Sequence, residues 1–129
     1  MEHEIKIEDG IFIVTASGSA DLRGFSAFLQ ELANNDDWTS GSRLMVDFRK
    51  LENFNPDNMD FSKLSSIASF IKKNSERFMN MKVVTLLIDE MDGMVVTGLW
   101  ESLQSYYGSE FKHEIFTNYN GAINWLNSN

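Results

Sequence analysis

Leu44-Met45-Val46-Asp47 and Val83-Val84-Thr85-Leu86-Leu87-Ile88-Asp89 are the two stretches that decide the fold of this chain. Each is a largely apolar run that ends in an aspartate, without regular alternation of apolar and polar residues. Strands of this kind are usually covered on both faces, as in a parallel sheet packed between helices. Ligands of such folds collect beyond the carboxyl ends of the strands. The two aspartates therefore mark the place where a site would open.

The segments around these strands predict an alternating order. Asp9-Gly10 is a pair typical of tight hairpins and joins predicted strands over residues 4–8 and 11–16. Three more strands are predicted over residues 43–48, 82–89 and 113–117. The predicted helices run from a cap at Ser19 or Asp21 to Asn34, from Asp57 or Asp60 to Arg77, from Glu90 to Tyr107, and onward from a cap at Asn118 or Asn120.

The resulting order, ββαβαβαβα, indicates a single α/β domain over residues 1–129. We expect a mixed, mostly parallel sheet of about five strands with about four helices. Trp38 is expected to pack back onto the core from a loop, and Gly98 to allow close packing of its helix against the sheet. The helical spacing predicts these buried residues: Leu22, Phe25, Leu29, Leu32, Phe61, Leu64, Ile67, Ala68, Ile71, Val96, Leu99, Trp100, Leu103, Tyr106, Tyr107, Ala122, Ile123 and Leu126.

Composition narrows the classes of function. The 129 residues are 43% hydrophobic and 12% aromatic, which favours a packed globular domain over disorder. The formal charge of −8 disfavours nucleic acids and anionic membranes as partners. The chain has no cysteine, and no apolar run approaches the roughly 20 residues that span a bilayer. With an acidic start at Met1-Glu2-His3-Glu4 we expect no signal peptide and a cytoplasmic location.

Several segments resemble the SpoIIAA-like, or STAS-like, family of small bacterial α/β domains. They are Leu44-Met45-Val46-Asp47-Phe48-Arg49 before a loop and helix, Lys82-Val83-Val84 at the start of the next strand, and Phe116-Thr117 through Ala122-Ile123-Asn124-Trp125-Leu126. The resemblance covers nearly the whole chain. It implies a sheet of about five strands with helices packed around it.

The resemblance implies two kinds of activity. Anti-sigma-factor antagonists of this fold carry a phosphorylatable serine in the loop after the strand that matches residues 44–48. Here that loop reads Phe54-Asn55-Pro56-Asp57-Asn58-Met59, without serine or threonine, and the nearest serine is Ser62. Other relatives resemble carriers of lipids or other nonpolar molecules.

Asp47 and Asp89 have two readings. They could form a carboxylate pair that binds a metal or shares a proton. Alternatively, Asp89 caps a helix and Asp47 bonds loop backbone, which is the common role of aspartate at such junctions. Asp89-Glu90-Met91-Asp92-Gly93 lacks the ligand spacing of a calcium loop. We favour the capping roles and predict no metal site.

No organised catalytic group stands out. His3 and His113 are the only histidines, and neither has the spacing of a metal ligand. The serines lie in no Gly-x-Ser-x-Gly elbow, and the chain has no phosphate-binding glycine motif. We therefore expect a protein that is not an enzyme and needs no cofactor.

Methionines give the candidate binding site. Met59, Met91 and Met94 fall in the first turns of the helices after the two decisive strands, and Phe54 lies in a loop nearby. Methionine suits adaptable apolar surfaces. We predict that these four residues line a pocket for a small nonpolar or amphipathic ligand, with Asp47 and Asp89 at its polar rim. The alternatives are ordinary core filling by these residues, and a protein-interaction or regulatory domain that uses the same surface.

A second apolar group lies at the opposite end of the predicted sheet. It comprises Phe70, Phe78, Met79 and Met81. An exposed apolar patch of this kind marks a protein partner or a homodimer interface. We predict this role for the group.

Overall fold

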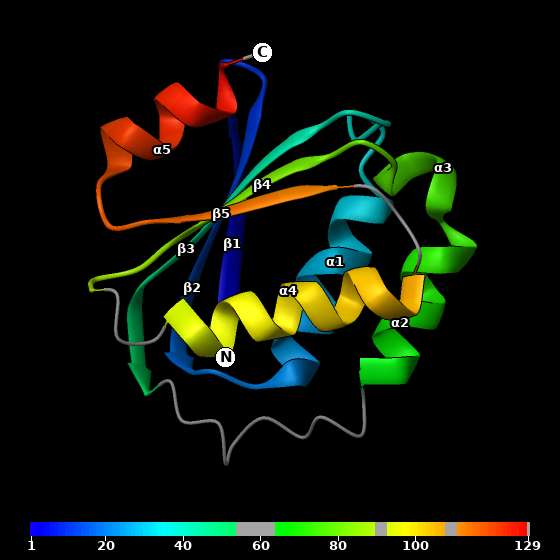
Figure 1. Cartoon of the computed structure of the whole chain (residues 1–129), viewed down its shortest axis with the longest axis horizontal. Helices are drawn as coiled ribbons and strands as arrows, with labels where there is room; N and C mark the ends of the chain where they lie inside the picture. The colour runs from blue at the N-terminus through cyan, green and yellow to red at the C-terminus, as the bar shows by residue number, and fades with distance from the viewer. Residues whose placement is uncertain (54–63, 90–92, 108–110, 129) are drawn as a thin grey trace.

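The computed structural model describes residues 1–53, 64–89, 93–107 and 111–128, with residues 53 and 105–107 described by their backbone alone. Within these ranges the strands form one sheet in the order β1-β2-β3-β4-β5 (Figure 1). β1 pairs antiparallel with β2, and the other neighbours pair parallel. The strands are β1 (Glu2–Glu8), β2 (Ile11–Ser19), β3 (Arg43–Asn53), β4 (Lys82–Leu86) and β5 (Lys112–Phe116).

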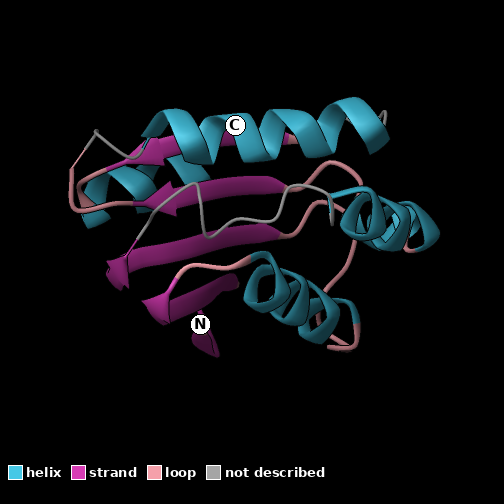
Figure 2. Cartoon of the chain, turned by 90° about the horizontal axis from the view of Figure 1, so that it is seen from below, coloured by secondary structure: helices cyan, strands magenta, loops and turns pink. Residues whose placement is uncertain are grey.

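The helices lie in two layers. They are α1 (Leu22–Ala33), α2 (Leu64–Lys73), α3 (Ser75–Phe78), α4 (Gly93–Tyr107) and α5 (Tyr119–Leu126). α1, α2 and α4 cover one face of the sheet and α5 covers the other (Figures 1 and 2). Strands that follow one another across a sheet, each joined by a right-handed crossover, place all the connecting helices on one face. α5 follows the last strand and is free to turn to the opposite face.

Local signals in the sequence explain how the elements begin. Asp9 and Gly10 have φ angles of 51° and 78°, the left-handed pair that a two-residue hairpin turn requires. Asp21 caps α1 by accepting from the N–H of Gly24 at 2.6 Å, and Asn118 caps α5 by accepting from Gly121 at 2.9 Å. The predicted hairpin and both of these caps are confirmed.

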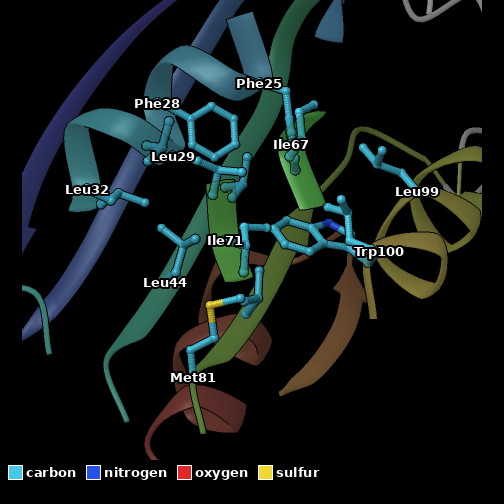
Figure 3. Close-up of a cluster of buried hydrophobic side chains, with 14 of the residues drawn as sticks. Phe25, Phe28, Leu29, Leu32, Leu44, Ile67, Ile71, Met81, Leu99 and Trp100 are labelled. Carbon is cyan, nitrogen blue, oxygen red and sulfur yellow. The ribbon is translucent and has the colours of Figure 1, made fainter. Parts of the chain in front are cut away.

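The larger core lies between the sheet and the three covering helices. Phe25 and Leu29 of α1, Ile71 of α2 and Trp100 of α4 point toward one another there (Figure 3). Trp38 is fully buried, as predicted, and its ring packs against Phe12 at 5.0 Å. A smaller cluster under α5 contains Ile11, Ile13, Met45, Val84, Leu86, Ala122 and Leu126. The sheet is thus covered on both faces at its centre, as the apolar strands predicted.

Several strand boundaries differ from the prediction. β1 starts at Glu2, and β3 continues to Asn53 because β2 extends to Ser19 and keeps pairing with it. β4 ends at Leu86, and the chain leaves the sheet after the Leu87 N–H bonds to the Phe116 carbonyl. Ile88, predicted to lie in the strand, is exposed.

One predicted helix is divided in the structure, so five helices are described where about four were expected. The helix expected to end at Arg77 divides into α2 and α3 at Asn74, whose ψ of 27° is not helical. The Asn74 side chain and backbone both bond to the Phe70 carbonyl, so asparagine ends α2 through its own polar groups. The expected start at Asp57 or Asp60 and the buried position of Phe61 lie outside the described residues.

The predicted partner patch is largely interior. Phe78 and Met81 are fully buried, and Phe70 is partly buried against the Phe78 ring. Only Met79 is exposed, at 47%. α3 turns Phe78 inward against Trp38, while the Arg77 guanidinium bonds to the Trp38 carbonyl. The prediction of an exposed four-residue patch is therefore wrong.

Candidate functional site

α4 and β5 lie side by side at one edge of the sheet (Figure 1). Between them are two hollows of about 500 and 350 Å³. Both are lined by Thr97, Glu101 and Ile115, so they form one continuous depression, which we call the α4–β5 groove. Its described lining residues are Gly93, Met94, Thr97, Gly98, Trp100, Glu101, Gln104, His113, Glu114, Ile115 and Thr117.

The periodicity of the two elements creates the groove. On α4, Val96, Leu99 and Leu103 face the core, and the residues at positions 94, 97, 98 and 101 fall on the side turned away from it. On β5, alternate residues point to the same face of the sheet, which brings His113 and Ile115 under α4. β5 is the last strand in the sheet, so nothing in the described sheet closes the groove on its outer side.

One end of the groove is mainly apolar. Met94 is 87% exposed there and faces the partly buried Ile115 across the hollow. Gly98 leaves the space open, because a Cβ at this position would meet no atom within 4 Å. The prediction that Gly98 permits close packing against the sheet is therefore wrong.

The other end is polar and aromatic. The His113 ring stacks on Trp100, with centroids 5.3 Å apart. One nitrogen of each ring contacts the same hydroxyl group. Trp100 Nε1 donates to Thr85 Oγ1 at 3.2 Å, and His113 Nε2 lies 2.9 Å from the same oxygen. Burial lowers the pKa of His113 to about 4, so the ring is neutral at pH 7.

This polar cluster is not organised for catalysis. Thr85 is fully buried and its hydroxyl is engaged by both rings, so it cannot reach a substrate as a nucleophile. Across the described ranges, no three histidine, aspartate or glutamate side chains are grouped as metal ligands would be. The groove offers apolar contact, hydrogen bonds and the Glu101 carboxylate, which are the means of binding.

Three of the six predicted site residues, Met94, Asp47 and Asp89, lie in the part of the chain that the structure describes. Met94 lies in the groove, while Phe54, Met59 and Met91 lie outside the described residues. Asp89 is exposed, three residues beyond the end of β4. Of the three predicted site residues that are described, Met94 lines the groove, and Asp47 and Asp89 do not.

Asp47 lies inside β3, two residues after Met45 of the α5 cluster. Side chains two residues apart in a strand point to the same face, so Asp47 lies on the face of the sheet that α5 covers. It is 7% exposed, and its two carboxylate oxygens accept from Nε and Nη2 of Arg49, each at 3.0 Å. The Arg49 backbone N–H also donates to Asp47, at 3.0 Å. These bonds match the alternative reading, in which Asp47 has a structural role.

Sequence reasoning missed Thr97, Glu101, His113 and Ile115 as site residues. The helical pattern of α4 was used to find its buried face, and the opposite face read as ordinary surface. The signal that could have found the groove is the position of residues 112–116 as the last strand, since a last strand in sequential order lies at an edge. Among the described helices, none is long and apolar enough to cross a bilayer.

Comparison with known proteins supports the fold. No family model and no curated protein matches this chain. A solved structure from Shewanella loihica PV-4, an uncharacterised protein of the DUF3478 family with a SpoIIAA-like fold, is similar with a TM-score of 0.56 and 14% identity. The alignment covers 97% of this chain and 92% of that chain. The chain therefore has a SpoIIAA-like fold, which confirms the resemblance seen in the sequence, and the likeness at this identity extends to the fold alone.

Proposed function

We propose that this protein is a non-enzymatic binding module and that the α4–β5 groove takes a nonpolar or amphipathic ligand. The observation that carries the proposal is the larger hollow, about 500 Å³ between Met94 and Ile115. Ligand sites are concave, of about 300–1,000 Å³, and combine apolar walls with a few polar groups. The groove has this composition, with Glu101 as the polar group between its two ends.

The position of the groove also supports the proposal, because the sequence predicts a pocket at the carboxyl end of the sheet. Ile115 and Thr117 lie at the carboxyl end of β5, and Met94 lies in the first turn of the preceding helix. Ligands of open α/β sheets collect at this end of the strands. The exposed Met94 side chain can adapt to ligands of different shape.

Titration with N-phenyl-1-naphthylamine, a neutral apolar dye whose fluorescence rises in apolar surroundings, tests the proposal. We expect saturable binding to the unmodified protein and loss of binding in Gly98→Leu, whose side chain would occupy the open space beside α4. Ser69→Leu is the matched control, because Ser69 is exposed on α2 and lines none of the described hollows beside β5. Equal dye binding by both variants, or no saturable binding at all, would refute the proposal.

A further inference from the structure

Two residues of β5 direct their backbone groups away from the described sheet. The Lys112 N–H donates to the Met81 carbonyl at 3.1 Å, and the Phe116 carbonyl accepts from Leu87 at 2.9 Å, so both residues direct their backbone toward β4. Backbone direction alternates along a strand. His113 and Ile115 therefore direct their N–H and C=O groups away from the sheet, where no described strand lies.

The same two residues line the groove with their side chains. A strand added beside β5 would hydrogen-bond to their backbone and place every second side chain under α4. The two edges of the sheet differ in the space that is left beside the edge strand. At the β1 edge, the His3 ring reaches across to the Glu31 carboxylate of α1, whereas hollows remain between β5 and α4.

Charge indicates which segment would fit. Glu101 and Glu114 are exposed lining residues, and the described lining of the groove contains no lysine or arginine. A second copy of this chain would bring the same residues and a charge of −8. Complementary charge favours correct partners and like charge opposes wrong ones. A basic segment therefore fits better than a second copy.

We infer that the α4–β5 groove binds an extended basic segment of a partner protein, which pairs with the backbone of β5 and inserts alternate apolar side chains beneath α4. Strand addition of this kind takes affinity from main-chain bonds and specificity from pockets for alternate side chains. β5 has five residues, so at about 3.3 Å per residue the bound segment is about five to seven residues long. The inference rests on the proposed function and names the class of its ligand.

The test uses the acetylated and amidated heptapeptide Lys-Val-Lys-Val-Lys-Val-Lys, measured by isothermal titration calorimetry with the full chain. We expect binding, and no binding of the matched peptide with glutamate in place of lysine. Glu101→Gln should weaken binding of the lysine peptide about two- to fivefold, the range for one exposed ion pair. Equal binding of the lysine and glutamate peptides would overturn the inference.

Backbone pairing is tested separately with two isomers, one N-methylated at the valines and one at the inner lysines. Only one of these sets of N–H groups can face β5, so we expect one isomer to lose affinity while the other retains more. The valine isomer fails if the segment runs antiparallel, and the lysine isomer fails if it runs parallel. Equal binding by both isomers and the parent peptide would overturn strand addition.

Proline substitutions supply the matched variants in the protein. Ile115→Pro removes an N–H that points away from β4, so we expect a folded protein by circular dichroism that no longer binds the peptide. Glu114→Pro removes an N–H that faces β4 and should destabilise the fold. Peptide binding by folded Ile115→Pro at full strength would overturn the inference.

The remaining outcomes separate the two proposals. Binding of N-phenyl-1-naphthylamine without binding of any peptide would leave the proposed function standing and overturn the inference. Failure of both probes would overturn both. A concentration-dependent dimer abolished by Ile115→Pro would show that a second copy pairs with β5, which also overturns the inference.

Discussion

A methyl group added at Gly98 tests the shape of the α4–β5 groove without removing a contact. A Cβ at this position meets no atom within 4 Å, so alanine enters without strain. Glycine inside a helix costs about 1 kcal/mol relative to alanine. We therefore expect Gly98→Ala to raise the free energy of unfolding by about 0.5–1 kcal/mol. The melting temperature should rise by about 2–5 °C in a chain of this size.

Gly24→Ala is the matched control in α1. A Cβ at Gly24 would lie 2.8 Å from the Met1 Cβ, which is too close for contact without displacement. The helical gain should then be cancelled or reversed. Urea and thermal unfolding followed by circular dichroism measure both variants. If Gly98→Ala were as destabilising as Gly24→Ala, the space beside α4 would be filled and the groove as described would not exist.

Three further predictions concern the surroundings of the groove. As the pH is lowered from 6.5 to 4, the free energy of unfolding should fall by up to about 1.4 kcal/mol per pH unit. The cause is that histidine in the unfolded chain takes up a proton, whereas folded His113, with its pKa lowered to about 4, does not. Urea unfolding across this range should show a smaller fall for His113→Gln, and an equal fall would contradict the burial of the neutral ring. Asp47→Asn should lower the free energy of unfolding by about 1–3 kcal/mol, because it weakens the hydrogen bonds from Arg49. Calorimetry should show an unchanged affinity for the peptide, and weaker binding would show that Asp47 takes part in the site. Lys82→Met should speed amide hydrogen exchange in α5, because Lys82 Nζ donates to the Trp125 and Ser128 carbonyls at 2.7 and 2.8 Å. Unchanged exchange would show that these hydrogen bonds do not stabilise the helix.

The layers of the fold could be predicted because they follow from local patterns. Apolar strand segments over residues 44–46 and 83–86 require cover on both faces, and the helices around them carry one apolar stripe each. Asp9-Gly10 fixes the first hairpin through its backbone preference. These signals depend on residues close in sequence, and the structure agrees with them.

The boundaries depended on distant partners and could not be predicted. β3 runs past Asp47 because β2 offers pairing as far as Ser19. Asp47 thereby becomes an interior residue of a strand instead of the last one. Its side chain faces α5, and a shift of one residue in a strand reverses the face. The sequence showed an aspartate after an apolar run, but the end of the strand was set elsewhere in the sheet.

The candidate site was missed for a similar reason. Glu101 and Thr97 read as the solvent side of an amphipathic helix, and they become lining residues only because β5 lies at the edge beside them. For Phe78 and Met81 the error was the opposite, because they were predicted to be exposed and are buried. α3 turns Phe78 inward against Trp38, and the local sequence does not show this. Met94 was placed correctly because a helix after a strand starts at the carboxyl end of the sheet.

Amide hydrogen exchange at His113 and Ile115 tests the central claim most directly. In the free protein both N–H groups point away from β4, so we predict fast exchange at these two positions beside protected amides at Lys112 and Glu114. Saturation with the lysine–valine heptapeptide should slow exchange at His113 and Ile115 and leave β1 unchanged. Protection of both amides in the free protein, or their continued fast exchange in the peptide complex, would contradict the account.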